Sequence, residues 1–229
     1  MSNLDAILPP LRRHLLDLAG QHRLTERSVP GEFAQVHGAW GRTPIELTTV
    51  AYAGDGALRR LQVAEVSSPD GAMAALTVVA LAAPEQSVPV FGADLVAFRG
   101  RFVLAALDLS GGVYTQSRAL LDARERLLDI GTPRDLPDFA RHCFSPMAAV
   151  VSEGAEPLDD ALKDAFIAYL VAFDEALGAA TARSRADGQA EHARYFSAMR
   201  ENKRESKALG RLFGEQWAER FFRELFFAA

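Results

Sequence analysis

One carboxylate lies within an otherwise apolar stretch of the sequence. Asp94 is the only acid in residues 88–98. In such surroundings a carboxylate must be paired, stay solvated at a cleft, or have its pKa raised. A carboxyl that holds a proton near neutral pH can deliver it to a substrate. The residues alone leave two interpretations open: a proton donor, or a strand-end acid that caps a turn.

A second acid in the same region has a plainer interpretation. Asp108 is followed by Ser110, Gly111 and Gly112, a sequence typical of a turn. We therefore interpret Asp108 as a structural residue.

The stretch around Asp94 is predicted to form a strand. Residues 88–96 and 100–109 are two apolar runs joined by a short turn, the pattern of adjacent strands. Because side chains alternate along a strand, Phe91 is predicted on one face of the sheet and Gly92 and Asp94 on the other. Gly92 has no side chain, so a flat substrate is predicted to lie against the backbone beside Asp94.

The remaining elements follow from the hydrophobic period. A helix comes first, then five strands, a helix, a sixth strand and two helical blocks. Strands in a row with short links favour an antiparallel sheet, so we predict an α+β fold with helices on both faces, in one domain covering residues 1–229. Residues 25–40 are predicted to be irregular. The predicted elements are 4–21, 45–52, 58–67, 76–83, 88–96, 100–109, 118–128, 144–151, 157–177 and 190–227.

Composition excludes several classes of protein. The formal net charge of -5 argues against a general nucleic-acid binder. Cys143 is the only cysteine, so a disulfide framework is excluded, and its apolar context indicates core packing. No leader sequence opens the chain and no apolar run reaches about 18 residues, so we predict a cytoplasmic protein with no membrane contact.

Motifs for metals and nucleotides are missing from the sequence. The five histidines show no HxxxH or HxH spacing, and no glycine-rich phosphate loop or serine-hydrolase elbow is present. The C-terminal stretch 213–227 repeats aromatic residues at helical spacing, which is more typical of a core than of a cofactor site.

Four separated segments carry a resemblance to a known family. In order along the chain, they resemble the pattern of the ferredoxin-dependent bilin reductases. The segments are Ile45-Glu46 to Leu58-Arg59-Arg60; Pro89-x-Phe91-Gly92-x-Asp94-Leu95-Val96; Arg134-x-Leu136-Pro137-x-Phe139 with Phe144-Ser145-Pro146; and Asn202 through Phe213-Gly214-x-x-Trp217 to Leu225-Phe226.

The resemblance implies a fold and an activity. It implies a three-layer α/β/α sandwich with a central antiparallel sheet. It also implies a monomer that reduces biliverdin or a dihydrobiliverdin to a phytobilin by sequential electron and proton transfers, with radical intermediates. The electrons would come from reduced ferredoxin, with no bound flavin, metal or nicotinamide.

The resemblance also implies site residues. Asp94 would protonate the bilin, and a second group of residues would bind it: Phe91, Arg134, Asn202, Lys203 and Arg204. Basic side chains would face an acidic ferredoxin, because complementary charge speeds encounter. These docking residues are Arg200, Lys207 and Arg211. The same basic segment also fits an ordinary solvated helix face.

The sequence departs from the family pattern at three positions. Val79 and Gln62 stand where some branches have a histidine and a glutamate, and Lys203 stands where the family usually has a second acid. Glu201 or Glu205 lies close enough in sequence to replace that acid. A non-catalytic bilin carrier and a reductase of a chlorophyll catabolite therefore stay open as alternatives. The double bond reduced, the transfer of two or four electrons, the ferredoxin and the oligomeric state are not fixed.

Overall fold

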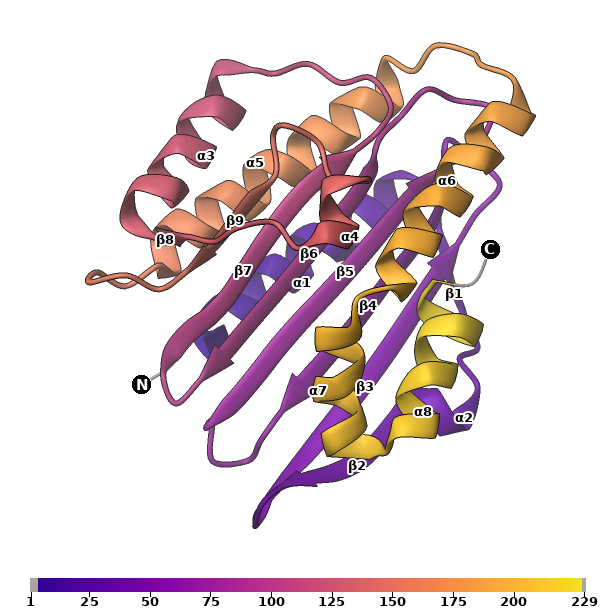
Figure 1. Cartoon of the computed structure of the whole chain (residues 1–229). Helices are drawn as coiled ribbons and strands as arrows, with labels where there is room; N and C mark the ends of the chain where they lie inside the picture. Colours follow the sequence, from indigo (N-terminus) through magenta and orange to yellow (C-terminus); the bar gives the residue numbers. More distant parts are fainter. Residues whose placement is uncertain (1–3, 228–229) are drawn as a thin grey trace.

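The computed structural model describes residues 4–227, with side chains from Ala6 onward, and is built around one antiparallel sheet (Figure 1). Within these residues the sheet has nine strands in the order β1-β3-β4-β5-β6-β7-β9-β8, and β2 also pairs with β3. This confirms the predicted α+β class. The strands are β1 (Thr25–Arg27), β2 (Gln35–Trp40), β3 (Thr43–Ala53), β4 (Leu58–Ser67), β5 (Met73–Ala82), β6 (Val90–Phe98), β7 (Arg101–Ser110), β8 (Thr132–Pro133) and β9 (Ala149–Ser152).

One face of the sheet is covered by three helices, α1 (Leu4–Gln21), α3 (Arg118–Ile130) and α5 (Asp159–Gly178). Their apolar side chains form one continuous core with the strands. Phe91 of β6 lies in this core, with its ring centroid 5.6 Å from that of Phe166 on α5. We interpret this layer as a packed apolar core.

The opposite face carries the C-terminal helices, and Figure 1 shows α6, α7 and α8 crossing it while α1 and α5 lie behind the sheet. The helical path is interrupted at Asn202, which separates α6 from α7, and at Gly214 (φ 103°), which separates α7 from α8. Gly38 of β2 allows α7 to approach, since a Cβ there would overlap the carbonyl oxygen of Leu212. The helices are α2 (Gly31–Ala34), α4 (Asp138–Arg141), α6 (Arg185–Arg200), α7 (Lys203–Phe213), α8 (Glu215–Arg220) and the π-helix η1 (Phe221–Phe226).

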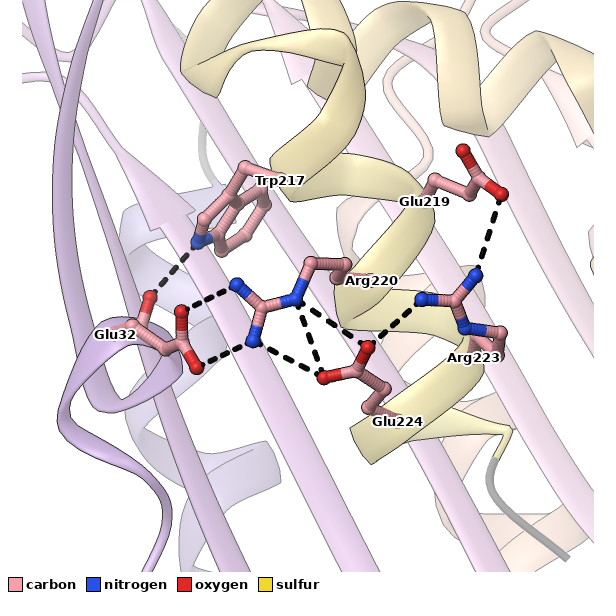
Figure 2. A network of polar contacts seen from close by, with 6 residues as sticks. All are labelled: Glu32, Trp217, Glu219, Arg220, Arg223 and Glu224. Carbon is pink, nitrogen blue, oxygen red and sulfur yellow. Dashed lines mark hydrogen bonds and ion pairs between the residues drawn. The ribbon is translucent and has the colours of Figure 1, made fainter.

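A polar network links α8 and η1 to α2 (Figure 2). The Arg220 guanidinium donates to both carboxylate oxygens of Glu32 at 2.7 and 2.8 Å, a bidentate pair, and also to Glu224. The indole nitrogen of Trp217 donates to the carbonyl oxygen of Glu32 at 2.8 Å. Arg223 adds hydrogen bonds to Glu219 and Glu224. These contacts hold α8 and η1 against α2.

Three regions differ most from the sequence prediction. Residues 25–40 are not irregular: they contain β1, α2 and β2, and Gly41 in the left-handed region (φ 62°) turns β2 back onto β3. The predicted strand 144–151 is only Ala149–Ser152, because the Ser145 amide donates to the Asp108 side chain instead of to a backbone carbonyl of a neighbouring strand. The last helical block begins at Arg185, where the Ser184 side chain caps α6 by accepting from Asp187 N.

Candidate active site

A cavity of about 360 Å³ lies between the sheet and the C-terminal helices. That volume falls in the range of small-molecule sites. Its floor comes from strands β3 to β7, and its walls come from α7, η1 and the segment 134–144. Representative lining residues are Ala75, Thr77, Asp94, Val96 and Ala106 of the floor and Asn202, Glu205, Leu209, Phe222 and Phe226 of the walls.

Asp94 is the acid of the cavity floor. Antiparallel pairing places it between Thr77 of β5 and Ala106 of β7, so all three side chains face the cavity. The Thr77 hydroxyl donates to Asp94 Oδ1 at 3.1 Å. Burial raises the pKa of Asp94 to about 6, against the opposing effect of the Thr77 hydrogen bond. A carboxyl with this pKa is partly protonated near neutral pH.

Glu205 is a second acid over the same floor. It lies in the first turn of α7, where Asn202 is the N-cap: Asn202 Oδ1 accepts from Glu205 N at 3.3 Å, and Asn202 Nδ2 donates to Glu205 Oε2 at 2.9 Å. Burial, and then the negative charge of Asp94, raise the pKa of Glu205 well above its usual range. Ionising both of these buried carboxyl groups is unfavourable because their negative charges repel each other. The pair therefore retains a proton.

A smaller chamber of about 30 Å³ adjoins Asp94 and is also lined by Glu205, Asp108 and Tyr195. A Cβ on Gly92 would lie 2.9 Å from the Tyr195 hydroxyl oxygen, so this tyrosine fills the space above Gly92. The prediction that a flat substrate lies against Gly92 was therefore wrong for this arrangement of α6. Glycine is needed there to admit the tyrosine.

Asp108 has the structural contacts expected of it, but it also faces the smaller chamber. Its carboxylate accepts from the Ser145 hydroxyl at 2.6 Å, from the Ser145 amide at 3.1 Å and from the Ser110 hydroxyl. Burial raises its pKa to about 6 despite these hydrogen bonds. Asp108 therefore both fixes the loop at Ser145 and presents a titratable carboxyl to the smaller chamber.

The predicted bilin-binding residues separate into two groups. Asn202, Arg204 and Arg134 line the cavity, and Arg134 Nη1 donates to the Val103 carbonyl oxygen at 2.6 Å. Lys203 and Phe91 do not appear in that lining: Lys203 is exposed, and Phe91 is buried against α5 on the other side of the sheet. Strand alternation puts Phe91 there, which argues against its predicted role in binding and leaves it out of the proposed site.

The predicted docking residues lie on the outside of the helical layer. Arg200, Lys207 and Arg211 are all exposed on α6 and α7. Their exposure is compatible with a partner surface and equally with a solvated helix face.

Sequence reasoning missed part of the wall and floor. Phe221, Phe222 and Phe226 were predicted as core; they are buried and also line the cavity. Thr77 gave no signal beyond its strand position, since only the β5–β6 register brings its hydroxyl to Asp94. Within residues 4–227 no group of three or more His, Cys, Asp or Glu side chains is arranged to hold a metal, and no helix is long and apolar enough to cross a membrane.

Fold and site define a three-layer sandwich whose ligand cavity has acids on its floor and wall. The family model described as ferredoxin-dependent bilin reductase matches residues 12–228. The chain therefore belongs to the ferredoxin-dependent bilin reductase family.

Individual relatives agree with this assignment. The chain is 29% identical over 177 residues to phycocyanobilin:ferredoxin oxidoreductase of Prochlorococcus marinus (strain MIT 9313), covering 74% of this chain and 66% of that protein. It is 29% identical over 204 residues to phycoerythrobilin:ferredoxin oxidoreductase of Synechococcus sp. (strain RCC307), covering 80% and 76%. The crystal structure of phytochromobilin synthase from tomato in complex with biliverdin superposes with a TM-score of 0.75 at 17% identity, over 96% of this chain and 82% of that one, which shows the shared fold.

Proposed function

We propose that this protein reduces an open-chain tetrapyrrole, biliverdin or a dihydrobiliverdin, with electrons from reduced ferredoxin. The observation that carries the proposal is the acid pair, Asp94 and Glu205, on a cavity of about 360 Å³. Family membership and the names of the relatives supply the substrate class and the electron donor.

The acid pair supplies protons to the bilin. Each reduced double bond takes up a pair of electrons and a pair of protons, and ferredoxin delivers electrons singly, so every electron needs a matched proton. Asp94, with a pKa of about 6, holds a proton in part of the population at neutral pH and gives it to the radical anion formed by electron transfer. Glu205, with its raised pKa, shares the proton that the pair retains and delivers it together with Asp94 from the α7 side, so it takes the role that the family acid would have at Lys203.

The walls bind the rest of the substrate. The aromatic rings of Phe222 and Phe226 offer apolar surface to a flat conjugated molecule. Arg134 and Arg204, from two different segments of the lining, are suited to charge-assisted hydrogen bonds with the propionates. Asn202 orients Glu205 and presents its own amide beside it.

Ferredoxin docking is assigned to the outer surface of the same helical layer. Arg200, Lys207 and Arg211 are exposed close in sequence to the cavity residues of α7. A positive surface here would attract an acidic ferredoxin and place the electron donor beside the bilin.

One experiment separates an enzyme from a bilin carrier, the candidate favoured by lysine at position 203. Purified protein is titrated with biliverdin, and reduced ferredoxin is then added under anaerobic conditions while the visible spectrum is recorded. The proposal predicts a spectral shift on mixing and a further change to a reduced bilin when electrons arrive. A shift on mixing with no change on reduction would identify a carrier, and no shift at all would contradict bilin binding.

A further inference from the structure

The smaller chamber adjoins Asp94, and although most of its lining is apolar, four groups that can exchange protons reach it. Asp94, Glu205, Asp108 and Tyr195 all line it. Its volume of about 30 Å³ is sufficient for a water molecule, which needs about 10–15 Å³ and two or more polar partners. The chamber therefore joins two carboxyl groups of adjacent strands, Asp94 on β6 and Asp108 on β7, through a space that a hydroxyl and a water can bridge.

The Tyr195 hydroxyl is the bridging group supplied by the protein. It lies over Gly92, between the strand positions of the two aspartates, because Gly92 pairs with Asp108 and is two residues from Asp94. Among the described residues it has no hydrogen-bond partner, so it is available to the chamber. Burial, and then the charge of Asp108, raise the pKa of Tyr195 well above its usual range. It thus stays protonated and passes a proton by accepting one and donating another.

On its other side, Asp108 is connected toward the surface. The Ser145 hydroxyl donates to Asp108 Oδ1 at 2.6 Å, and the Tyr114 hydroxyl donates to Ser145 Oγ at 3.4 Å. Tyr114 is partly exposed on the segment before α3. Hydroxyl and carboxyl groups therefore follow one another from the partly exposed Tyr114 through Ser145 and Asp108 to the chamber.

We infer that Asp108 and Tyr195 form a proton relay that reloads Asp94 after it has protonated the bilin. The Asp108 carboxyl gives its proton to Tyr195 or a chamber water, which passes a proton to the Asp94 carboxylate. Asp108 then regains a proton from solvent through Ser145 and Tyr114. No electron and no heavy atom moves, and the net change is one solvent proton on Asp94. The inference rests on the proposed function, and Asp108 and Tyr195 are positioning residues that act through Asp94.

The relay is needed only after Asp94 has given its first proton to the bilin. Asp94 is loaded from the resting pH equilibrium before electrons arrive, so the first proton transfer does not need the relay. Every later transfer does. Loss of the relay should therefore slow the later transfers, most strongly at high pH, while biliverdin affinity and the first transfer stay at wild-type values.

The test compares two tyrosine-to-phenylalanine variants. Tyr195→Phe removes the relay hydroxyl and keeps the ring. Tyr169→Phe is the matched control, because its hydroxyl is also buried but donates to the Met147 carbonyl oxygen outside the cavity. Each variant is titrated with biliverdin and mixed with reduced ferredoxin in a stopped-flow spectrometer between pH 6 and pH 8.5, in H₂O and in D₂O.

We expect Tyr195→Phe to bind biliverdin with the wild-type spectrum and complete the first transfer normally. The later transfers should then slow about tenfold, less than the roughly 10²–10⁴-fold loss of a direct general acid, because the relay acts through Asp94. The slowing should grow with pH and with deuterium, and Tyr169→Phe should leave the pH profile unchanged. Asp108→Asn, with folding checked by thermal melting, should give the same profile as Tyr195→Phe.

The relay would be overturned if either Tyr195→Phe or Asp108→Asn kept the wild-type rates of the later proton transfers and the wild-type pH profile. Loss of biliverdin affinity in Tyr195→Phe would also overturn it, since the hydroxyl would then be a ligand contact. Failure of the wild-type protein to bind or reduce biliverdin would instead contradict the proposed function, so the two failures are distinguishable.

Discussion

The two faces of the sheet differ in the environment that they give to the side chains of the same strands. On the face beneath α1, α3 and α5, alternate residues such as Phe91 and Leu95 are fully buried in apolar packing. On the face beneath α6, α7 and η1, the alternate residues of the same strand are Gly92, Asp94 and Val96, and Asp94 and Val96 line the cavity. One strand thus provides both the core and the site.

This division explains how a carboxyl can be kept in an apolar environment. Burying an ionised group is costly, and the protein must provide that free energy elsewhere. The packed face provides it: Phe91, Phe166 and Phe173 fill one layer with aromatic contacts at centroid separations of 5.6 and 6.0 Å. We interpret the first face as the source of stability and the second as the site of chemistry, and each prediction below tests that separation.

The largest effect is expected at the cavity face. Asp94→Asn keeps the shape of the side chain and its hydrogen bond from Thr77 but removes the transferable proton. Reduction of biliverdin should slow by about 10²–10⁴-fold, with affinity for biliverdin nearly unchanged. Stopped-flow absorbance with reduced ferredoxin measures both, and a long-lived radical signal should accumulate. Asp129→Asn, at an exposed position of α3, is the control. Wild-type turnover of Asp94→Asn would make Asp94 structural.

A change on the opposite face should lower stability and leave biliverdin binding intact. Phe91→Ala removes a fully buried ring from the core against α5, so the free energy of unfolding should fall by about 3–5 kcal/mol. Urea unfolding measures this loss, with Phe91→Leu as a milder control. The folded fraction at low temperature should retain biliverdin affinity. Loss of affinity without loss of stability would place Phe91 in the binding site, contrary to its location.

The pH dependence of stability should come from the cavity face. The pKa of Asp94 is raised in the folded protein to about 6, so the folded state binds the extra proton and stability falls as pH rises from about 4 to about 6. Asp94→Asn should therefore gain about 1–3 kcal/mol relative to wild type between pH 4 and pH 7. Chemical unfolding at a series of pH values tests this. A constant difference across that range would mean that Asp94 is ionised in both states.

The smallest effect is expected on the outside of the helical layer. Reversing Arg200 and Lys207 to glutamate should lower the ferredoxin-dependent rate a few-fold at low salt and leave biliverdin affinity unchanged. Added salt should lower the wild-type rate toward that of the variant, because exposed charges are screened beyond about 8–10 Å. Arg13→Glu on α1, beneath the other face, is the control. Equal ferredoxin-dependent rates for wild type, the double reversal and Arg13→Glu would show that ferredoxin docks on another surface.

Much of the sheet could be predicted because local pattern determines it. Asp94 and Phe91 were correctly placed on opposite faces, since alternation along a strand is independent of what the strand packs against. The residues of the cavity walls were harder to predict. Glu205 stayed one of two options, and only the N-cap at Asn202 decides that Glu205 turns inward while Glu201 stays exposed. Tyr195 above Gly92 depends on the path of α6 across the sheet, which no local pattern encodes.

The central claim is that Asp94 and Glu205 act together as one source of protons. The most direct test measures the single-turnover rate of biliverdin reduction at pH 7 for wild type, Asp94→Asn, Glu205→Gln and the double variant, with bilin binding verified by spectrum. Groups that act as a unit give non-additive losses. We predict that the double variant is no slower than Asp94→Asn alone. A double variant whose loss equals the product of the two single losses would show that the acids act independently, and would contradict this account.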